Sequence, residues 1–242
     1  MTSSSLDCPG FFNEKLESSP KIRSAVDSSL SAVADILQIS TLPFFTDYTD
    51  HGTRHLTTLI EIADKLIGEP TRELFTAEDA AVLIFSVLLH DLALHLSEGG
   101  FKSIVMPAQG EEHCESTDWG EAWDEFLSEA RHWDDHKLVE LFGCNETGAP
   151  IALVRDPFDH YGDLTESDRK LIGEFIRRHH AQLAYQFAVR GSPATTVRLF
   201  NSVRLTKSSE NLAELLRAVT ATLCGIAFIS AAYRLMMRSM ER

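Results

Sequence analysis

Apolar residues recur at helical spacing along most of this chain. Over residues 21–38 they fall at Ile22, Val26, Leu30 and Val33, which places them on one face of a predicted helix. Few stretches alternate with a period of two, so we predict an all-α protein. Further helices are predicted, within cap and breaker residues, over 53–67, 77–89, 123–133, 138–142, 164–190 and 211–237.

The helix over 77–89 is predicted to be central, because residues 80–89 are strongly apolar and Thr76 to Asp79 forms a capping-box pattern. The apolar run ends at His90 and Asp91, resumes, and meets His95 one turn later. Burying imidazole and carboxylate groups is costly unless a partner satisfies them, and a metal ion commonly does so. The alternative is that Asp91 only caps the end of the helix.

Polar segments divide the predicted helices. Residues 1–19 are Ser-rich and are predicted to be a flexible N-terminus, with a single domain over 20–242. The Gly99-Gly100 pair is predicted to end a helical section, and residues 101–120 are predicted to be irregular. Residues 145–163 are predicted to form a polar loop.

The net charge of the chain limits the kinds of molecule that it is expected to bind. The net charge of −14 argues against stable nucleic-acid binding, which needs an excess of Lys and Arg. The balance is uneven, because residues 1–168 hold 10 basic and 32 acidic residues whereas residues 169–242 hold 12 and 4. A positive site for an anionic small molecule therefore remains compatible with the sequence.

Cysteine usage and hydropathy predict a cytoplasmic protein. The four cysteines are scattered without a CxxC pattern, and the N-terminus lacks the pattern of a signal peptide. Residues 218–233 carry no formal charge but fall short of the roughly 20 residues that a membrane span needs. We interpret them as a packing helix, with membrane contact as the alternative, and expect no membrane span.

Histidines on three predicted helices indicate a metal site. They are His55, the His90-Asp91 pair, and the neighbours His179 and His180. Neutral imidazole nitrogens with one hard carboxylate oxygen suit Mn, Fe, Mg or Zn better than calcium. We therefore predict a site for a divalent metal ion.

A second histidine group is a weaker candidate for a structural zinc site. His132 and His136 are spaced i,i+4, and His113 and Cys114 precede them. One cysteine in place of two matches a zinc finger poorly. The many acidic residues over 111–135 are interpreted as a solvated helix face rather than a cation site.

The order His, His-Asp, His on successive helices resembles the HD-domain superfamily of metal-dependent phosphohydrolases. The segments DYTDHGTRHL, HDLALHLSEGGF, EAWDEFLSEARHWDDHKLVELFG and LTESDRKLIGEFIRRHHAQLA resemble its HD-CE branch. In that branch an HD domain commonly precedes a chaperone-type (GHKL) ATPase module. The resemblance covers about residues 25–190 and implies an HD-like helical bundle with an acidic, Trp-rich insertion.

The resemblance also implies a ligand set. His55 matches the first metal ligand, and His90 and Asp91 match the signature pair, with Asp91 able to bridge two metals. His180 matches the histidine that begins a His-x-x-x-Ala pattern, with His179 as the alternative.

Other residues are implied as supporting groups. His51 lies in the DHG turn of the branch and is expected beside the ligands, and His95 is expected to orient Asp91. Arg177 and Arg178 are candidate phosphate clamps, the alternative being solvent-facing arginines. The implied chemistry is attack of a metal-activated water on a phosphoryl group.

The C-terminal third departs from the HD pattern. No Asp or His follows Arg190, and Leu223-Cys224-Gly225 stands where the branch has Ser-His-Gly. Cys224 is either a substitute ligand or a packing residue, and we expect no ATPase module after the HD-like domain.

Two functions are therefore open. One is a phosphohydrolase or phosphodiesterase acting on a nucleotide or another phosphorylated small molecule. The other is a catalytically impaired HD domain that acts as a ligand sensor or regulatory module, with an ATPase or signalling protein as its partner.

Overall fold

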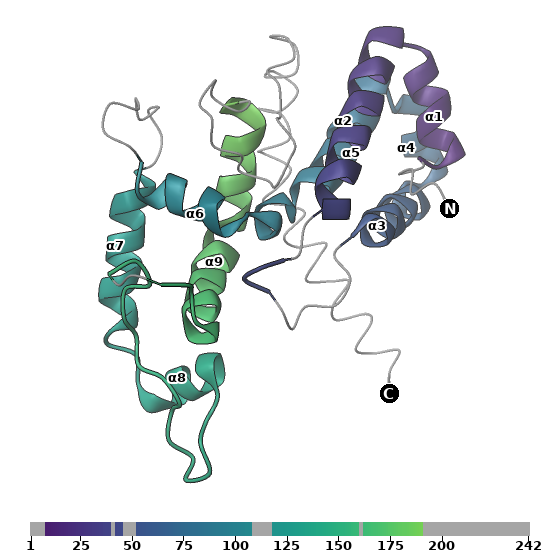
Figure 1. The fold of residues 1–242 in the computed structure, drawn as a ribbon. Coiled ribbons are helices and arrows are strands. Elements are labelled where there is room, and N and C mark those ends of the chain that lie inside the picture. The colour runs from purple at the N-terminus through teal and green to yellow at the C-terminus, as the bar shows by residue number, and fades with distance from the viewer. Residues whose placement is uncertain (1–7, 40–41, 46–51, 108–117, 160–161, 191–242) are drawn as a thin grey trace.

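The protein is helical throughout the parts of the chain that the structure describes. This computed structural model describes residues 8–39, 42–45, 52–107, 118–159 and 162–190. They contain helices and a single isolated β-bridge between Cys144 and Pro150, which confirms the predicted all-α fold (Figure 1). The elements are α1 Gly10–Glu17, α2 Pro20–Ile39, α3 Thr53–Leu66, α4 Glu69–Leu74, α5 Ala77–Leu89, η1 Leu92–His95, α6 Glu98–Val105, α7 Trp119–Ala130, α8 Asp135–Phe142 and α9 Glu166–Arg190.

The helices form two groups that meet at the end of α5. Figure 1 shows α1 to α5 gathered on one side and α6 to α9 on the other, with the short helix η1 between them. Helix α5 contacts α1, α2, α3, α9 and η1, and η1 in turn packs on α9. Buried apolar side chains from both groups belong to one continuous cluster. The His-Asp pair therefore lies where the two groups join.

Helix α5 has the central role that the sequence predicts. Thr76 accepts a hydrogen bond from the Asp79 backbone, and the Asp79 side chain accepts one from the Thr76 backbone, so the capping box is present. Nine of its residues are buried, including Ile84 and Leu88. Burial of these residues fixes the orientation of α5 and therefore the position of His90 and Asp91 at its end.

The N-terminal segment differs from the prediction of a flexible terminus over residues 1–19. Residues Gly10–Glu17 form α1, and the side chains of Phe12 and Leu16 are fully buried. Phe12 packs near Phe75, and α1 contacts both α2 and α5. Long-range burial of two large side chains outweighs the polar local composition.

Helix α6 is a second difference, because it occupies part of the segment predicted to be irregular. It begins at Glu98, and the Ser97 side chain caps it by accepting a hydrogen bond from the Gly100 backbone. Gly99 and Gly100 fall in the first turn, so they do not interrupt the helix interior. Phe101 and Val105 are buried and anchor the helix to the core.

The Trp-rich insertion forms α7 and α8 and packs on α9. Trp123 lies edge-on to Phe175 of α9, with ring centroids 5.2 Å apart, and Trp119 donates a hydrogen bond to Gln186. Arg178 of α9 forms an ion pair with Glu129 of α7 at 2.9 Å. Aromatic packing and this ion pair therefore hold the insertion against the long helix.

None of the helices in the described part of the chain is both long and apolar enough to span a bilayer. The predicted helix over 211–237, with the uncharged stretch 218–233 and Cys224, lies outside the described residues.

Candidate metal centre

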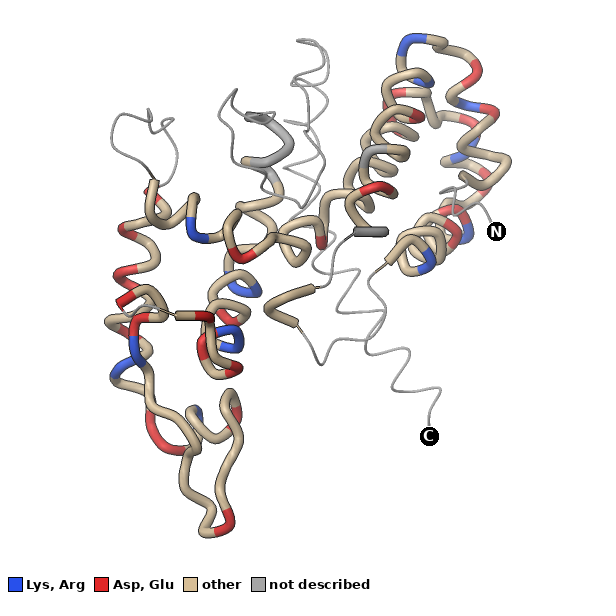
Figure 2. Tube along the Cα trace, in the orientation of Figure 1, with Lys and Arg blue, Asp and Glu red and all other residues tan. Residues whose placement is uncertain are grey.

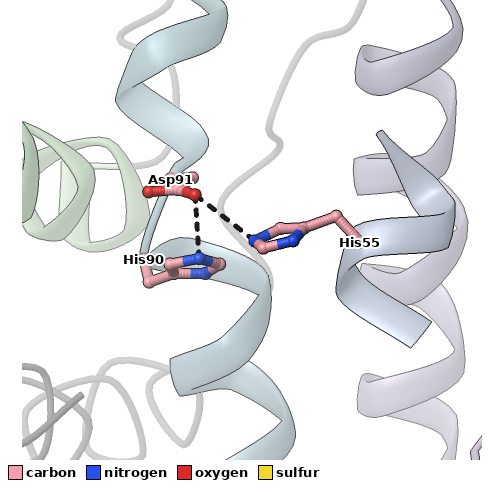
Figure 3. A group of neighbouring side chains, drawn as sticks. All are labelled: His55, His90 and Asp91. Carbon is pink, nitrogen blue, oxygen red and sulfur yellow. Dashed lines mark ion pairs between the residues drawn. The ribbon is translucent and has the colours of Figure 1, made fainter. Parts of the chain in front are cut away.

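Three side chains converge at the junction of the helix groups. His55, His90 and Asp91 each offer a ligand atom, and these atoms lie within 4.8 Å of one another (Figure 3). Asp91 Oδ2 lies 2.9 Å from His90 Nε2 and 3.6 Å from His55 Nε2. His90 is 5% exposed, and the side chains of His55 and Asp91 are 19% and 16% exposed. The site is thus mostly screened from solvent but retains access to it.

The backbone geometry changes after α5, between the two residues of the signature pair. His90 keeps a helical conformation with φ −56° and ψ −39°, and its N–H donates to the Ser86 carbonyl at 3.1 Å. Asp91 turns to φ −110° and ψ 6° and is the N-cap residue of the 3₁₀ helix η1, in which the Leu94 N–H donates to the Asp91 carbonyl. The tighter turn lets consecutive side chains serve one site.

His55 lies in the first turn of α3. The helix begins after Gly52, and Leu56, Leu59 and Ile60 bury its apolar face. Helix α3 contacts α5, and the rings of His55 and His90 lie 5.5 Å apart. Packing between two helices therefore brings together residues that are distant in the sequence.

A hydrogen bond to the backbone fixes the tautomer of His90. Its Nδ1 lies 2.6 Å from the Val87 carbonyl oxygen, which can only accept, so Nδ1 carries a proton. In a neutral ring the lone pair then resides on Nε2, the atom that faces Asp91. Metal-binding histidines commonly have this arrangement, with one ring nitrogen held by a carbonyl.

The donor set fits a divalent cation. A neutral Nε2 lone pair and a carboxylate oxygen 2.9 Å apart repel each other unless a proton or a cation lies between them. Two imidazole nitrogens and one carboxylate oxygen are ligands that Mn, Fe, Mg and Zn accept. Three protein donors leave coordination positions for water or a phosphate oxygen.

His95 lies close in sequence but outside the group of three. It ends η1 and is 5% exposed, so its imidazole is buried beside the junction. Its expected role in orienting Asp91 stays a prediction, and the donors that converge among the described residues are His55, His90 and Asp91.

The structure does not bring His179 and His180 into the group of three. His180 Nδ1 lies 2.8 Å from the Arg177 carbonyl oxygen, and the residue is partly exposed on α9. His179 packs against Phe175 at 4.6 Å and edge-on to Trp119 at 5.7 Å. Burial, together with the charge of Arg178, lowers the pKa of His179. In this conformation the fourth implied ligand is not beside the other three.

The two candidate phosphate clamps are engaged by carboxylates. Arg177 pairs with Glu174 at 2.8 Å, and Arg178 bridges Glu174 and Glu129. Glu174 is 7% exposed, and its role was missed at the sequence level. The i,i+3 and i,i+4 spacing of Glu174 to the two arginines could have indicated these ion pairs from the sequence.

Two of the remaining candidates can be located in the structure. His132 and His136, proposed in the alternative zinc site, are exposed, and His132 Nδ1 lies 2.7 Å from the Ser128 carbonyl. His51, His113 and Cys114 fall outside the described residues.

The described part of the chain is helical, and a histidine from one helix meets a His-Asp pair at the end of its neighbour. Together with the family match, these features define an HD domain. Residues 45–226, which are more than half of the chain, match the HD-CE family model, and the chain belongs to the HD-CE family. The predicted resemblance is thereby confirmed. No curated protein and no solved structure matches the chain.

Proposed function

We propose that this protein is a metal-dependent phosphohydrolase or phosphodiesterase acting on a nucleotide or a related phosphorylated small molecule. The observation that carries the proposal is the convergence of His55, His90 and Asp91 in a member of the HD-CE family. HD-type domains commonly bind divalent metals, and the three donors here are compatible with such an ion. The protein would act in the cytoplasm.

The three donors would hold one divalent ion, either Mn, Fe, Mg or Zn. When bound, such an ion supplies a water of lowered pKa and stabilises negative charge on a phosphoryl oxygen. The Val87 carbonyl keeps the His90 ring oriented with Nε2 toward the site. Asp91 supplies the negative charge that favours a cation between the two imidazoles. We retain His180, His179 and His51 as candidate ligands for a conformation that carries a second ion.

Arg177 is the better of the two candidate phosphate clamps. Its side chain is 52% exposed, whereas that of Arg178 is 29% exposed and lies over Phe126 and Trp133. A phosphate would have to compete with Glu174 for Arg177 and with two carboxylates for Arg178. Arg178 therefore has the larger structural role.

A specific observation supports the second function, a catalytically impaired HD domain. This chain has Leu223-Cys224-Gly225 where the branch has Ser-His-Gly. A cysteine therefore replaces a histidine near the end of the segment that matches the family. Such a domain would bind a phosphorylated ligand and regulate an ATPase or signalling protein, without turnover.

Metal analysis followed by an activity panel separates these functions. Purified protein would be analysed for metal, then assayed on nucleotides, cyclic nucleotides and phosphomonoesters, alongside His90→Ala and Asp91→Ala. The enzyme proposal predicts bound metal and turnover that both substitutions abolish. His132→Ala is the matched control, since His132 is an exposed histidine outside the site. Ligand binding without turnover supports the sensor, and metal-free wild type that takes up no added metal contradicts the enzyme proposal.

A further inference from the structure

The segment after the β-bridge exposes apolar side chains. Ile151 and Leu153 are 57% and 76% exposed. Exposure alternates from residue to residue over 151–156, which is the two-residue period of an extended backbone. In the described part of the chain, the backbone N–H groups of Ala152, Leu153 and Val154 donate to no other backbone group. Residues 151–155 thus form an extended segment next to the β-bridge, called the 151–155 edge below.

A cavity of about 540 Å³ lies beside the 151–155 edge. Its apolar lining includes Phe142 of α8 and Leu171 of α9, and its polar lining includes Thr165 and Ser167. A volume of this size accepts one or two side chains of a bound peptide. The edge thus offers backbone hydrogen bonds and a cavity for alternate side chains in one place.

The surroundings of the edge are acidic. Residues 131–168 hold nine Asp and Glu against three Lys and Arg. Two of those basic residues are in ion pairs, Lys137 with Glu140 and Arg155 with Asp168. Figure 2 shows acidic positions along α7, α8 and the loop that follows α8. A complementary partner carries positive charge.

We infer that the 151–155 edge is a docking site to which a partner protein adds an extended segment with alternating apolar and basic residues. A strand added on the side away from Gly143 can pair with the backbone groups of alternate residues, Ala152 and Val154. The partner's apolar side chains cover Ile151 and Leu153 or enter the cavity, and its basic side chains meet the surrounding carboxylates. Exposed strand edges are the usual templates for such pairing. This inference does not depend on the proposed metal chemistry.

Binding of a defined peptide to the full chain tests the inference. The probe is a fluorescent nonapeptide of alternating lysine and valine, measured by anisotropy at physiological salt. Two control peptides replace lysine by glutamate, or carry N-methyl groups on the valine backbone nitrogens. We expect the lysine peptide to bind, the glutamate peptide not to bind, and N-methylation to weaken binding by about tenfold or more because it removes backbone donors.

A pair of matched variants locates the binding site. Leu153→Lys removes an apolar contact and adds like charge, so it should weaken binding by about tenfold or more. Leu74→Lys is the control, because Leu74 is 81% exposed at the end of α4. Both variants should melt at the wild-type temperature. No binding by wild type, equal binding of the N-methylated peptide, or equal loss in both variants would overturn the inference. So would a wild-type dimer that Leu153→Lys dissociates, since the occupant would then be a second copy.

Discussion

His55 and Asp91 meet across two helices, with His55 Nε2 3.6 Å from Asp91 Oδ2 (Figure 3). The same carboxylate oxygen lies 2.9 Å from His90 Nε2, so one oxygen faces two imidazoles. A cation held by the three side chains would link α3 to the end of α5. Metal binding is therefore expected to affect the stability of the fold as well as its chemistry.

Added divalent metal should raise the melting temperature of the protein. A ligand that binds only the folded state at about 100 times its Kd stabilises it by about 2.7 kcal/mol. We expect Mn²⁺ or Zn²⁺ to raise the temperature measured by differential scanning fluorimetry, and EDTA to reverse the rise. His55→Ala and Asp91→Ala should abolish the response, whereas His132→Ala should keep it. An undiminished rise in Asp91→Ala would show that the ion binds elsewhere.

Gly173 allows α9 to approach residues 42–45 closely. A Cβ atom at this position would lie 2.6 Å from the Phe44 carbonyl oxygen. Although alanine normally favours a helix, Gly173→Ala should destabilise the protein by about 1–3 kcal/mol through this overpacking. Urea unfolding measures the change. Gly99→Ala in α6 is the control, because its Cβ would meet no atom within 4 Å, and it should be neutral or stabilising.

Local signals were sufficient to predict much of the fold. The capping box at Thr76 and the apolar run that follows it define α5, and three of the implied ligands do converge at its end. The absence of His180 from that group could not be predicted, because helical phasing gives a direction on one helix and no distance between helices.

Differences arose where long-range packing decides the outcome. Helix α1 depends on burial of Phe12 and Leu16 against distant elements, which the Ser-rich start of the chain does not indicate. Arg178 is close to Glu174 in sequence, but its ion pair with Glu129 requires the insertion to fold back on α9. Such contacts become visible only once the helices are placed.

Phe12 is expected to make α1 an integral part of the core. Its side chain is fully buried, and its ring lies 6.1 Å from that of Phe75. Phe12→Ala should therefore lower the free energy of unfolding by about 3–5 kcal/mol. Glu14→Ala, at an exposed position of the same helix, should change it little. If the two variants unfold at the same urea concentration, α1 is not packed as the structure describes.

Asp168 at the start of α9 provides a pH-dependent contribution to stability. It is 2% exposed, pairs with Arg155 at 2.7 Å, and accepts hydrogen bonds from the Thr165 backbone and hydroxyl. Burial by itself would raise the pKa of Asp168, but the bonds from Arg155 and Thr165 outweigh it and lower the pKa below its ordinary value of 3.8. The folded state therefore favours the ionised carboxylate.

Asp168→Asn removes that charge while keeping the size of the side chain, and it should lower stability by about 1–3 kcal/mol near neutral pH. Because the folded pKa is lowered, the contribution of Asp168 is complete above the unfolded value of 3.8 and is lost as the pH falls through the folded value. Urea unfolding at a series of pH values should show the wild type and the variant converging only in that acidic range. Asp159→Asn, at an exposed position, should unfold at the same urea concentration as the wild type throughout the pH series. A difference between wild type and Asp168→Asn that persists unchanged under acid would mean that charge is not what stabilises this end of α9.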